Sequence, residues 1–149
     1  MTLIALVLMA TQVAAAGGSK PDFSGQWVIN AAESDFGLIP APQCRGLKLS
    51  HREPELTSEE TRPGGEPCGL TLRYTTDGKP ITYTANDAKQ TARMTWSGNI
   101  LVIQRSSDDG ITMRIEAALS ADGRKLTRDF SVDSPQGSTS WLYVYDRAK

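Results

Sequence analysis

Residues 92–132 read ARMTWSGNILVIQRSSDDGITMRIEAALSADGRKLTRDFSV and decide the fold class. Glycine-containing turns at 98–99, 109–110 and 122–123 divide this stretch into four runs rich in alternating apolar and polar residues. Alternation with a period of two is the pattern of a β-strand that is buried on one face. Glycine tolerates the positive φ angles of tight hairpin turns, so the stretch predicts four consecutive antiparallel strands.

The same alternation continues on both sides of this stretch. Further runs begin near Phe23, Leu47, Leu56, Leu70, Ile81 and Trp141. No window keeps the i, i+3, i+4, i+7 apolar spacing of an amphipathic helix for three turns. We therefore expect an all-β chain with about ten strands, joined mostly by hairpins, and an irregular crossing at residues 33–43.

A long meander has two exposed edges unless it curls round and closes. We therefore expect an antiparallel up-and-down meander that closes into a barrel of about 8–10 strands. A flattened sandwich of two sheets is the alternative.

Length and charge exclude several classes of protein. A chain of 149 residues has room for one domain. Its 16 basic and 17 acidic residues give a net charge of −1, and neither a basic run nor a zinc-ligand spacing occurs. A nucleic-acid partner is therefore not expected.

The first 16 residues differ from the rest. Residues 3–13 are apolar except for Thr11 and Gln12, and three alanines follow at 14–16, which is the layout of a signal peptide and its cleavage site. The apolar run is too short to span a bilayer, so no membrane span is expected. No Lys or Arg precedes this run, so either the α-amino group supplies the positive charge or translation starts upstream.

These features predict three segments in a secreted or periplasmic protein. Residues 1–16 form the signal peptide, residues 17–22 a flexible N-terminal segment, and residues 23–149 the β-barrel domain. The sequence has two cysteines, Cys44 and Cys68, and an oxidising compartment favours a disulfide between them. Two free thiols are the alternative. Strict alternation would point Cys44 outward and Cys68 inward, so a bridge requires a bulge or a loop that breaks the alternation.

The first strand contains the motif Gly-x-Trp, as Gly25-Gln26-Trp27. The chain resembles lipocalins and the wider calycin group, which begin their barrels in this way. Residues 21–37 also look like the opening of small secreted bacterial lipocalin-like proteins of uncharacterised function. In the family, a basic side chain near the end of the last strand covers the tryptophan. The resemblance thus implies a lipocalin-like barrel closed at one end by Gly25, Trp27 and Arg147.

The resemblance is incomplete at the lid. The long lid loop of lipocalins and the helix–turn–helix that covers fatty-acid-binding proteins are both missing from the sequence. A second resemblance concerns small periplasmic barrels that inhibit secreted metalloproteases, which also open with Ser-Gly-x-Trp and contain one disulfide. It implies that residues 17–22 enter a protease cleft.

Catalytic motifs are absent from the sequence. His51 is the only histidine, and no G-x-S-x-G, phosphate-binding loop, dinucleotide fingerprint or H-E-x-x-H occurs. We therefore expect no enzyme activity, no cofactor and no metal site.

Polar residues that share the inward parity of apolar neighbours are the candidates for binding. Arg105 follows two apolar positions of the same parity, and Arg128 lies between Leu126 and Phe130. An arginine inside a barrel is unfavourable unless it is paired or binds an anion, and its planar fork suits a carboxylate. We therefore predict that Arg128, helped by Arg105 and Tyr143, binds the head group of an acidic amphiphile. The residues predicted to contact its tail are Leu72, Met94, Met113 and Phe130.

Simpler interpretations stay open. Arg128 can lie at the barrel mouth or pair with Glu116 or Asp129, and the methionine and aromatic residues can be plain core. The expected function is that of an exported, monomeric protein that binds a small hydrophobic or amphipathic molecule. A protein-binding module such as a protease inhibitor, or a structural envelope-associated barrel without a ligand, is the alternative. A continuous cavity of roughly 300 Å³ or more would favour ligand binding.

Overall fold

The computed structural model describes residues 18–149, so the predicted signal peptide at 1–16 lies outside the described residues. No residue in the described range is helical, and hence no helix there could cross a membrane. Ten strands form one antiparallel sheet. The strands are β1 (Gly25–Ile29), β2 (Gly46–Arg52), β3 (Glu55–Thr61), β4 (Pro67–Thr75), β5 (Ile81–Ala85), β6 (Ala88–Ser97), β7 (Ile100–Ser107), β8 (Thr112–Leu119), β9 (Lys125–Ser134) and β10 (Gly137–Arg147).

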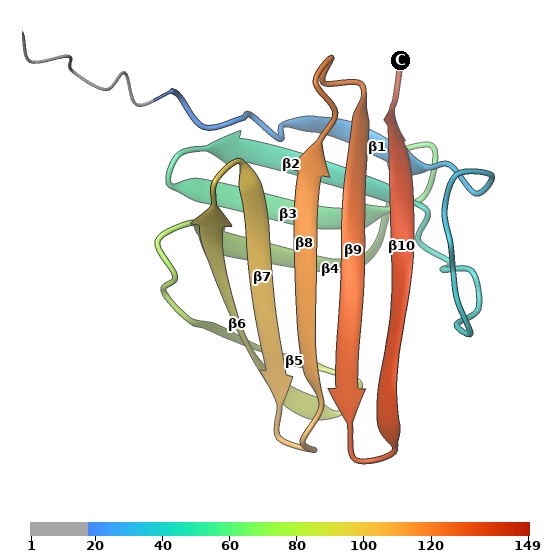
Figure 1. Cartoon of the computed structure of the whole chain (residues 1–149), viewed down its shortest axis with the longest axis vertical. Coiled ribbons are helices and arrows are strands. Elements are labelled where there is room, and N and C mark those ends of the chain that lie inside the picture. Colours follow the sequence, from blue (N-terminus) through green and yellow to red (C-terminus); the bar gives the residue numbers. More distant parts are fainter. Residues whose placement is uncertain (1–17) are drawn as a thin grey trace, which may run out of the picture.

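The sheet is a meander that curls back on itself. Consecutive strands are neighbours except at β4 and β5, and β1 pairs with β10 to join the two ends of the chain. An isolated bridge between Asp77 and Thr95 lies at the seam between β4 and β6. Figure 1 shows β6 to β10 side by side, with β2, β3 and β4 crossing behind them at a steep angle. The predicted barrel is therefore confirmed, with ten strands and near closure.

Burial follows the alternation that the sequence predicts. On β9, for example, Leu126 and Phe130 are buried, whereas Asp129 between them is exposed. Apolar side chains from the inward positions fill a common core. The largest fully buried side chains are Phe23, Trp27, Met94, Leu101, Ile115 and Leu126.

Trp27 is buried beside Phe23 at one end of the barrel, called the closed end because side chains fill it. Its indole Nε1–H donates to the carbonyl of Phe23 at 3.1 Å, and the Arg147 guanidinium carbon lies 4.3 Å from the ring centroid. Gly25 has a φ of 143°, and a Cβ there would collide with the Arg147 guanidinium. Glycine tolerates this positive φ and has no Cβ to displace the guanidinium, so Gly25 allows Arg147 of the last strand to stack on Trp27.

The two cysteines form a disulfide, with their Cα atoms 5.6 Å apart. Cys44 lies in the crossing loop before β2, where no strand sets its direction. Across from Cys68, the pairing of β3 with β4 shifts register between Glu59 and Thr61. The loop and this irregularity break the alternation, which explains how cysteines of opposite expected parity meet. The alternative of two free thiols does not apply.

Candidate functional site

Two adjoining hollows occupy the barrel toward the end opposite Trp27. Their volumes are about 630 Å³ and about 300 Å³, and both are lined by Glu60, Arg105 and Met113. Volumes of this size fall in the range of small-molecule sites. Near Phe23, in contrast, the free space measures only about 20 Å³, so the closed end is filled by side chains.

Arg105 lies at the junction of the two hollows. Its Nη2 donates to the Tyr74 hydroxyl at 3.0 Å, whereas its Nε is buried and has no acceptor among residues 18–149. Burial by itself would lower the pKa of Arg105, but the Tyr74 and Tyr83 oxygens and the Glu60 carboxylate raise it. Arg105 is therefore a permanent cation at this junction.

Arg128 points into the barrel from β9 and lines the smaller hollow. Its Nη1 donates to the Tyr145 hydroxyl at 3.4 Å, and its guanidinium carbon lies 5.0 Å from the centroid of the Phe130 ring. The aromatic face and the phenol oxygen partly compensate for the lost hydration of the charge. Neither contact neutralises it.

The ion pairs that the sequence left open for Arg128 do not form. Glu116 pairs instead with Arg114, with 2.8 Å between Oε1 and Nη2. Glu116 and Asp129 face each other in register at positions between the inward ones, and thus lie on the outer face of the sheet. In the described part of the chain, neither Arg105 nor Arg128 forms an ion pair with a carboxylate.

Tyrosine hydroxyls add neutral hydrogen-bonding groups to the lining. Tyr143 and Tyr145 line the smaller hollow and Tyr83 the larger one. Burial raises the pKa of all three phenols. They therefore stay protonated at neutral pH and can each donate a hydrogen bond to an oxygen of a ligand.

Glu60 is the one carboxylate that lines both hollows. Its Oε2 accepts a hydrogen bond from the backbone N–H of Leu70 at 3.1 Å. The sequence does not single out Glu60, because β3 has Leu56 as its only large apolar side chain. Ser58 and Glu60 share the parity of Leu56, so that parity was the available signal. Asp109 lines the larger hollow as well, whereas Glu60 supplies the only carboxylate among the described residues that line the smaller hollow, beside the two guanidinium groups.

The apolar residues predicted to contact a ligand fall into two groups. Met113 lines both hollows, and Phe130 lines the smaller one beside Tyr143. Leu72 and Met94 belong to the packed core, with 8% and 2% of their surfaces exposed, and neither lines a hollow of useful size. A tail contact with Leu72 or Met94 would require the packed end to open, and the ligand contacts as a whole remain a prediction.

No protein-family model matches the chain, and no curated protein sequence does. Solved structures, however, share its shape. A secretory abundant heat soluble protein from Ramazzottius varieornatus superposes with a TM-score of 0.66 at 12% identity, covering 84% of this chain and 94% of the other. Zebrafish ileal bile-acid-binding protein, complexed with cholic acid, superposes with a TM-score of 0.60 at 17% identity, covering 85% of this chain and 98% of the other. Fatty-acid-binding protein 1 of Echinococcus granulosus superposes with a TM-score of 0.63 at 13% identity, covering 85% of this chain and 98% of the other.

The chain therefore shares the fold of these barrel proteins. At these identities the likeness concerns the ten-stranded barrel and its near closure. In this barrel the crossing loop covers part of the mouth: Asp35 forms a bridge with Leu142, and the centroids of the Phe36 and Tyr143 rings lie 5.7 Å apart. Pro42 from the same loop lines the smaller hollow. The lid is thus an irregular strap without a helix.

The N-terminal segment lies at the other end of the barrel. Lys20 Nζ donates to the carbonyl of Gly98 at 2.7 Å and lies 5.2 Å from the centroid of the Trp96 ring. No group of three His, Cys, Asp or Glu side chains that could hold a metal ion occurs between residues 18 and 149.

Proposed function

We propose that this protein binds a small amphipathic molecule with an acidic head group inside its barrel. Arg128 and Arg105 hold the head group, Tyr143 adds a hydrogen bond, and the apolar part runs past Met113 into the larger hollow. One observation carries the proposal: two inward guanidinium groups line one space, and neither has a carboxylate partner. A poorly hydrated cation without a counter-ion is unfavourable, and a bound anion would compensate both.

The shape of the space supports an amphiphile over a simple ion. A head group in the smaller hollow leaves the larger one, lined in part by Leu70, Ile111 and Met113, for an apolar portion. Two neighbours of the same fold are named for binding a bile acid and a fatty acid, which are both acidic amphiphiles. The proposal extends this ligand class to a chain that matches them in fold.

We also propose that the protein is exported and acts as a monomer in the periplasm or outside the cell. The disulfide between Cys44 and Cys68 supports export, because such bridges persist mainly in oxidising compartments. Fractionation of the native cell, with mass determination of the mature N-terminus near Gly17, tests this part. Recovery of full-length, reduced protein from the cytoplasm would contradict it.

Titration with a dansyl-labelled undecanoic acid tests the binding site. The wild-type protein should bind the probe, and Arg128→Ala should weaken binding by about 10-fold or more, because a charge-assisted hydrogen bond to the carboxylate is lost. Arg114→Ala is the matched control, since Arg114 lies on the outer face and is paired with Glu116. The methyl ester of the probe should bind the wild type weakly.

Two results would overturn the proposed function. One is the absence of probe uptake by the wild-type protein, together with native mass spectra that show no co-purifying small molecule. The other is equal affinity of wild type and Arg128→Ala for the acid, which would show that the Arg128 guanidinium does not bind the carboxylate.

A further inference from the structure

The position of Glu60 is unusual for a carboxylate. It lies on β3 at the register irregularity and lines both hollows beside Arg105 and Met113. A carboxylate placed inside a cavity loses hydration, which is unfavourable unless other groups satisfy it. Only its Oε2 has a partner within the described residues, namely the Leu70 N–H, whereas Oε1 accepts no hydrogen bond.

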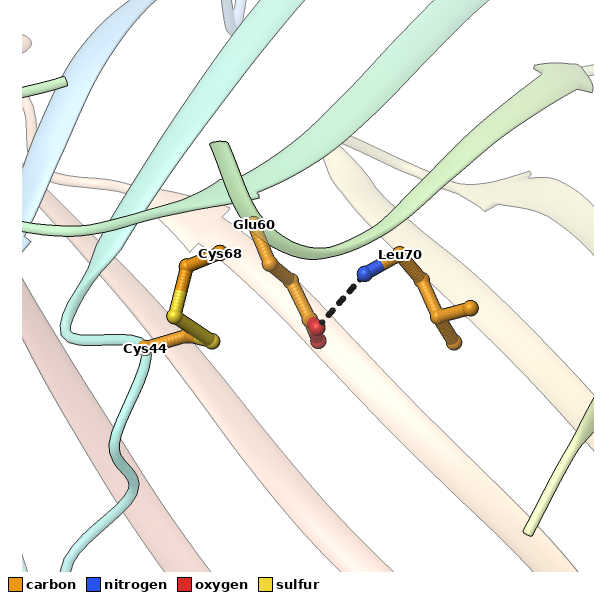
Figure 2. The surroundings of a disulfide bond; sticks show 4 residues. All are labelled: Cys44, Glu60, Cys68 and Leu70. Carbon is orange, nitrogen blue, oxygen red and sulfur yellow. Dashed lines mark hydrogen bonds between the residues drawn. A yellow bond between two sulfur atoms is a disulfide. The ribbon is translucent and has the colours of Figure 1, made fainter. Parts of the chain in front are cut away.

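Three features surround Glu60 in this position (Figure 2). The Leu70 N–H binds its Oε2, and the disulfide between Cys44 and Cys68 lies beside it. Gly69 leaves room for the carboxylate, since a Cβ at residue 69 would collide with Oε2 and would lie 3.3 Å from Cys44 Sγ. The Leu70 N–H thus holds one carboxylate oxygen at a defined point of the cavity, and Gly69 leaves the space for it.

A ligand that uses the whole cavity must pass this point. Its head group lies at Arg128 in the smaller hollow, and the closed end offers only about 20 Å³, so the rest of the molecule must extend into the larger hollow. The two hollows meet at Glu60, Arg105 and Met113. The middle of the ligand therefore lies between the Glu60 carboxylate, whose Oε1 accepts no hydrogen bond within the described residues, and the Arg105 guanidinium.

A plain hydrocarbon segment at this junction would satisfy neither group and would remove water from both. A hydroxyl group would satisfy both, because it donates to Glu60 Oε1 and accepts from the Arg105 guanidinium. We propose that Glu60 makes the site selective for acidic amphiphiles that carry a hydroxyl group in the middle of the molecule. This inference rests on the proposed function and narrows it to one class of ligand.

Competition titrations against the dansyl-labelled acid test this selectivity with two probes of equal length. The probes are octadecanoic acid and the same acid with one hydroxyl group in the middle of the chain. The wild-type protein should bind the hydroxy acid about 10-fold more tightly, since a hydrogen bond to a charged group is gained. The ratio of the two affinities is the measured quantity, so a general loss of binding does not imitate the effect.

Two substitutions at Glu60 separate charge from hydrogen bonding. Glu60→Gln keeps an oxygen that can accept from Leu70 and should reduce the ratio to a few-fold. Glu60→Met removes the acceptor, so the ratio should fall to about one and octadecanoic acid should bind more tightly than to the wild type. Glu59→Gln is the matched control: it removes the same charge one residue earlier, on the other face of the strand, and should leave the ratio unchanged. Circular dichroism and thiol titration check that each variant keeps its fold and its disulfide.

The outcomes distinguish this inference from the proposed function. If the wild type binds both acids equally, or if Glu60→Met keeps the preference for the hydroxy acid, the role of Glu60 is wrong while acid binding at Arg128 stands. If the wild type binds neither acid, the proposed function fails and the selectivity fails with it. A preference that is lost in Glu60→Met and kept in Glu59→Gln establishes the inference.

Discussion

The two ends of the barrel are built on opposite principles. At the closed end, Trp27 is 1% exposed, Phe23 is fully buried, and only about 20 Å³ is free. At the other end, Arg105, Arg128 and Glu60 border hollows of about 300 and 630 Å³. Both ends are made by the same strands, so the difference lies in which side chains occupy the inward positions near each end.

This contrast separates stability from binding. Close packing at one end stabilises the barrel through the apolar surface that it buries. At the charged end, Phe130, Tyr143 and Tyr145 also belong to the core, but they share their surroundings with charged side chains, a disulfide and a strap. A binding site gains from this division, because its polar side chains are not required for folding. Substitutions at the two ends should therefore affect different measurements.

The largest effect is expected for Trp27→Ala at the closed end. Removing a fully buried indole should lower the free energy of unfolding by about 3–5 kcal/mol. It also leaves Arg147 without its aromatic partner. Urea unfolding followed by circular dichroism measures the change. A decrease in the free energy of unfolding of less than about 1 kcal/mol would show that the closed end is not the centre of stability.

The next effect concerns the disulfide at the charged end. Replacing Cys44 and Cys68 by serine should lower the free energy of unfolding by about 3 kcal/mol, since the bridge closes a 24-residue separation in the unfolded chain. A reducing agent should have the same effect on the wild type and none on the double variant. If the double variant is as stable as the wild type, the charged end is held by its own packing after all.

Alternation made most of this architecture predictable from the sequence. A period of two and glycine turns specify strands and hairpins, and the inward parity of Arg105 and Arg128 followed from their apolar neighbours. Parity does not say how far along the barrel a residue lies. Leu72 and Met94 share the inward face with Met113, but only Met113 borders the hollows. Depth depends on the tilt and stagger of the strands, which no single strand encodes.

Glu60 shows a second limit of the sequence. Its strand offers a single large apolar residue from which to set the parity, and the register shifts beside it. The hydrogen bond from the Leu70 N–H fixes its direction, and the disulfide from Cys44, far away in the sequence, lies beside it. Local patterns therefore located the arginines but not their acidic neighbour.

A smaller effect, visible in the dependence of stability on pH, is expected at Glu53 near the closed end. Its Oε1 accepts from His51 Nε2 at 2.7 Å and from Trp96 Nε1 at 3.0 Å, and its Oε2 accepts from the Thr76 hydroxyl at 2.8 Å. Partial burial alone would raise the pKa of Glu53, but these hydrogen bonds lower it below 4.5. The carboxylate therefore stabilises the fold above its ordinary pKa, and this contribution is lost as the pH falls through the lower pKa of the folded state.

Glu53→Gln should thus reduce the free energy of unfolding by about 1–2 kcal/mol at pH 7, because His51 and Trp96 lose a charged acceptor. The difference from the wild type should shrink as the pH falls from 5 to 3. Urea midpoints across this range measure both quantities. A constant difference down to pH 3 would show that the carboxylate charge of Glu53 plays no part.

The smallest change in stability, with the opposite sign, is expected for Arg105→Met at the charged end. Its guanidinium has a buried Nε without an acceptor and no ion-pair partner, so a methionine of similar length should raise the free energy of unfolding by up to about 1 kcal/mol. The same variant should weaken binding of an acidic probe by about 10-fold, since half of the cationic pair is lost. A gain in stability combined with a loss of binding is the signature of a residue kept for its ligand. A loss of more than about 2 kcal/mol would mean instead that Arg105, through Tyr74, is part of what holds the barrel together, and the contrast between its two ends would no longer hold.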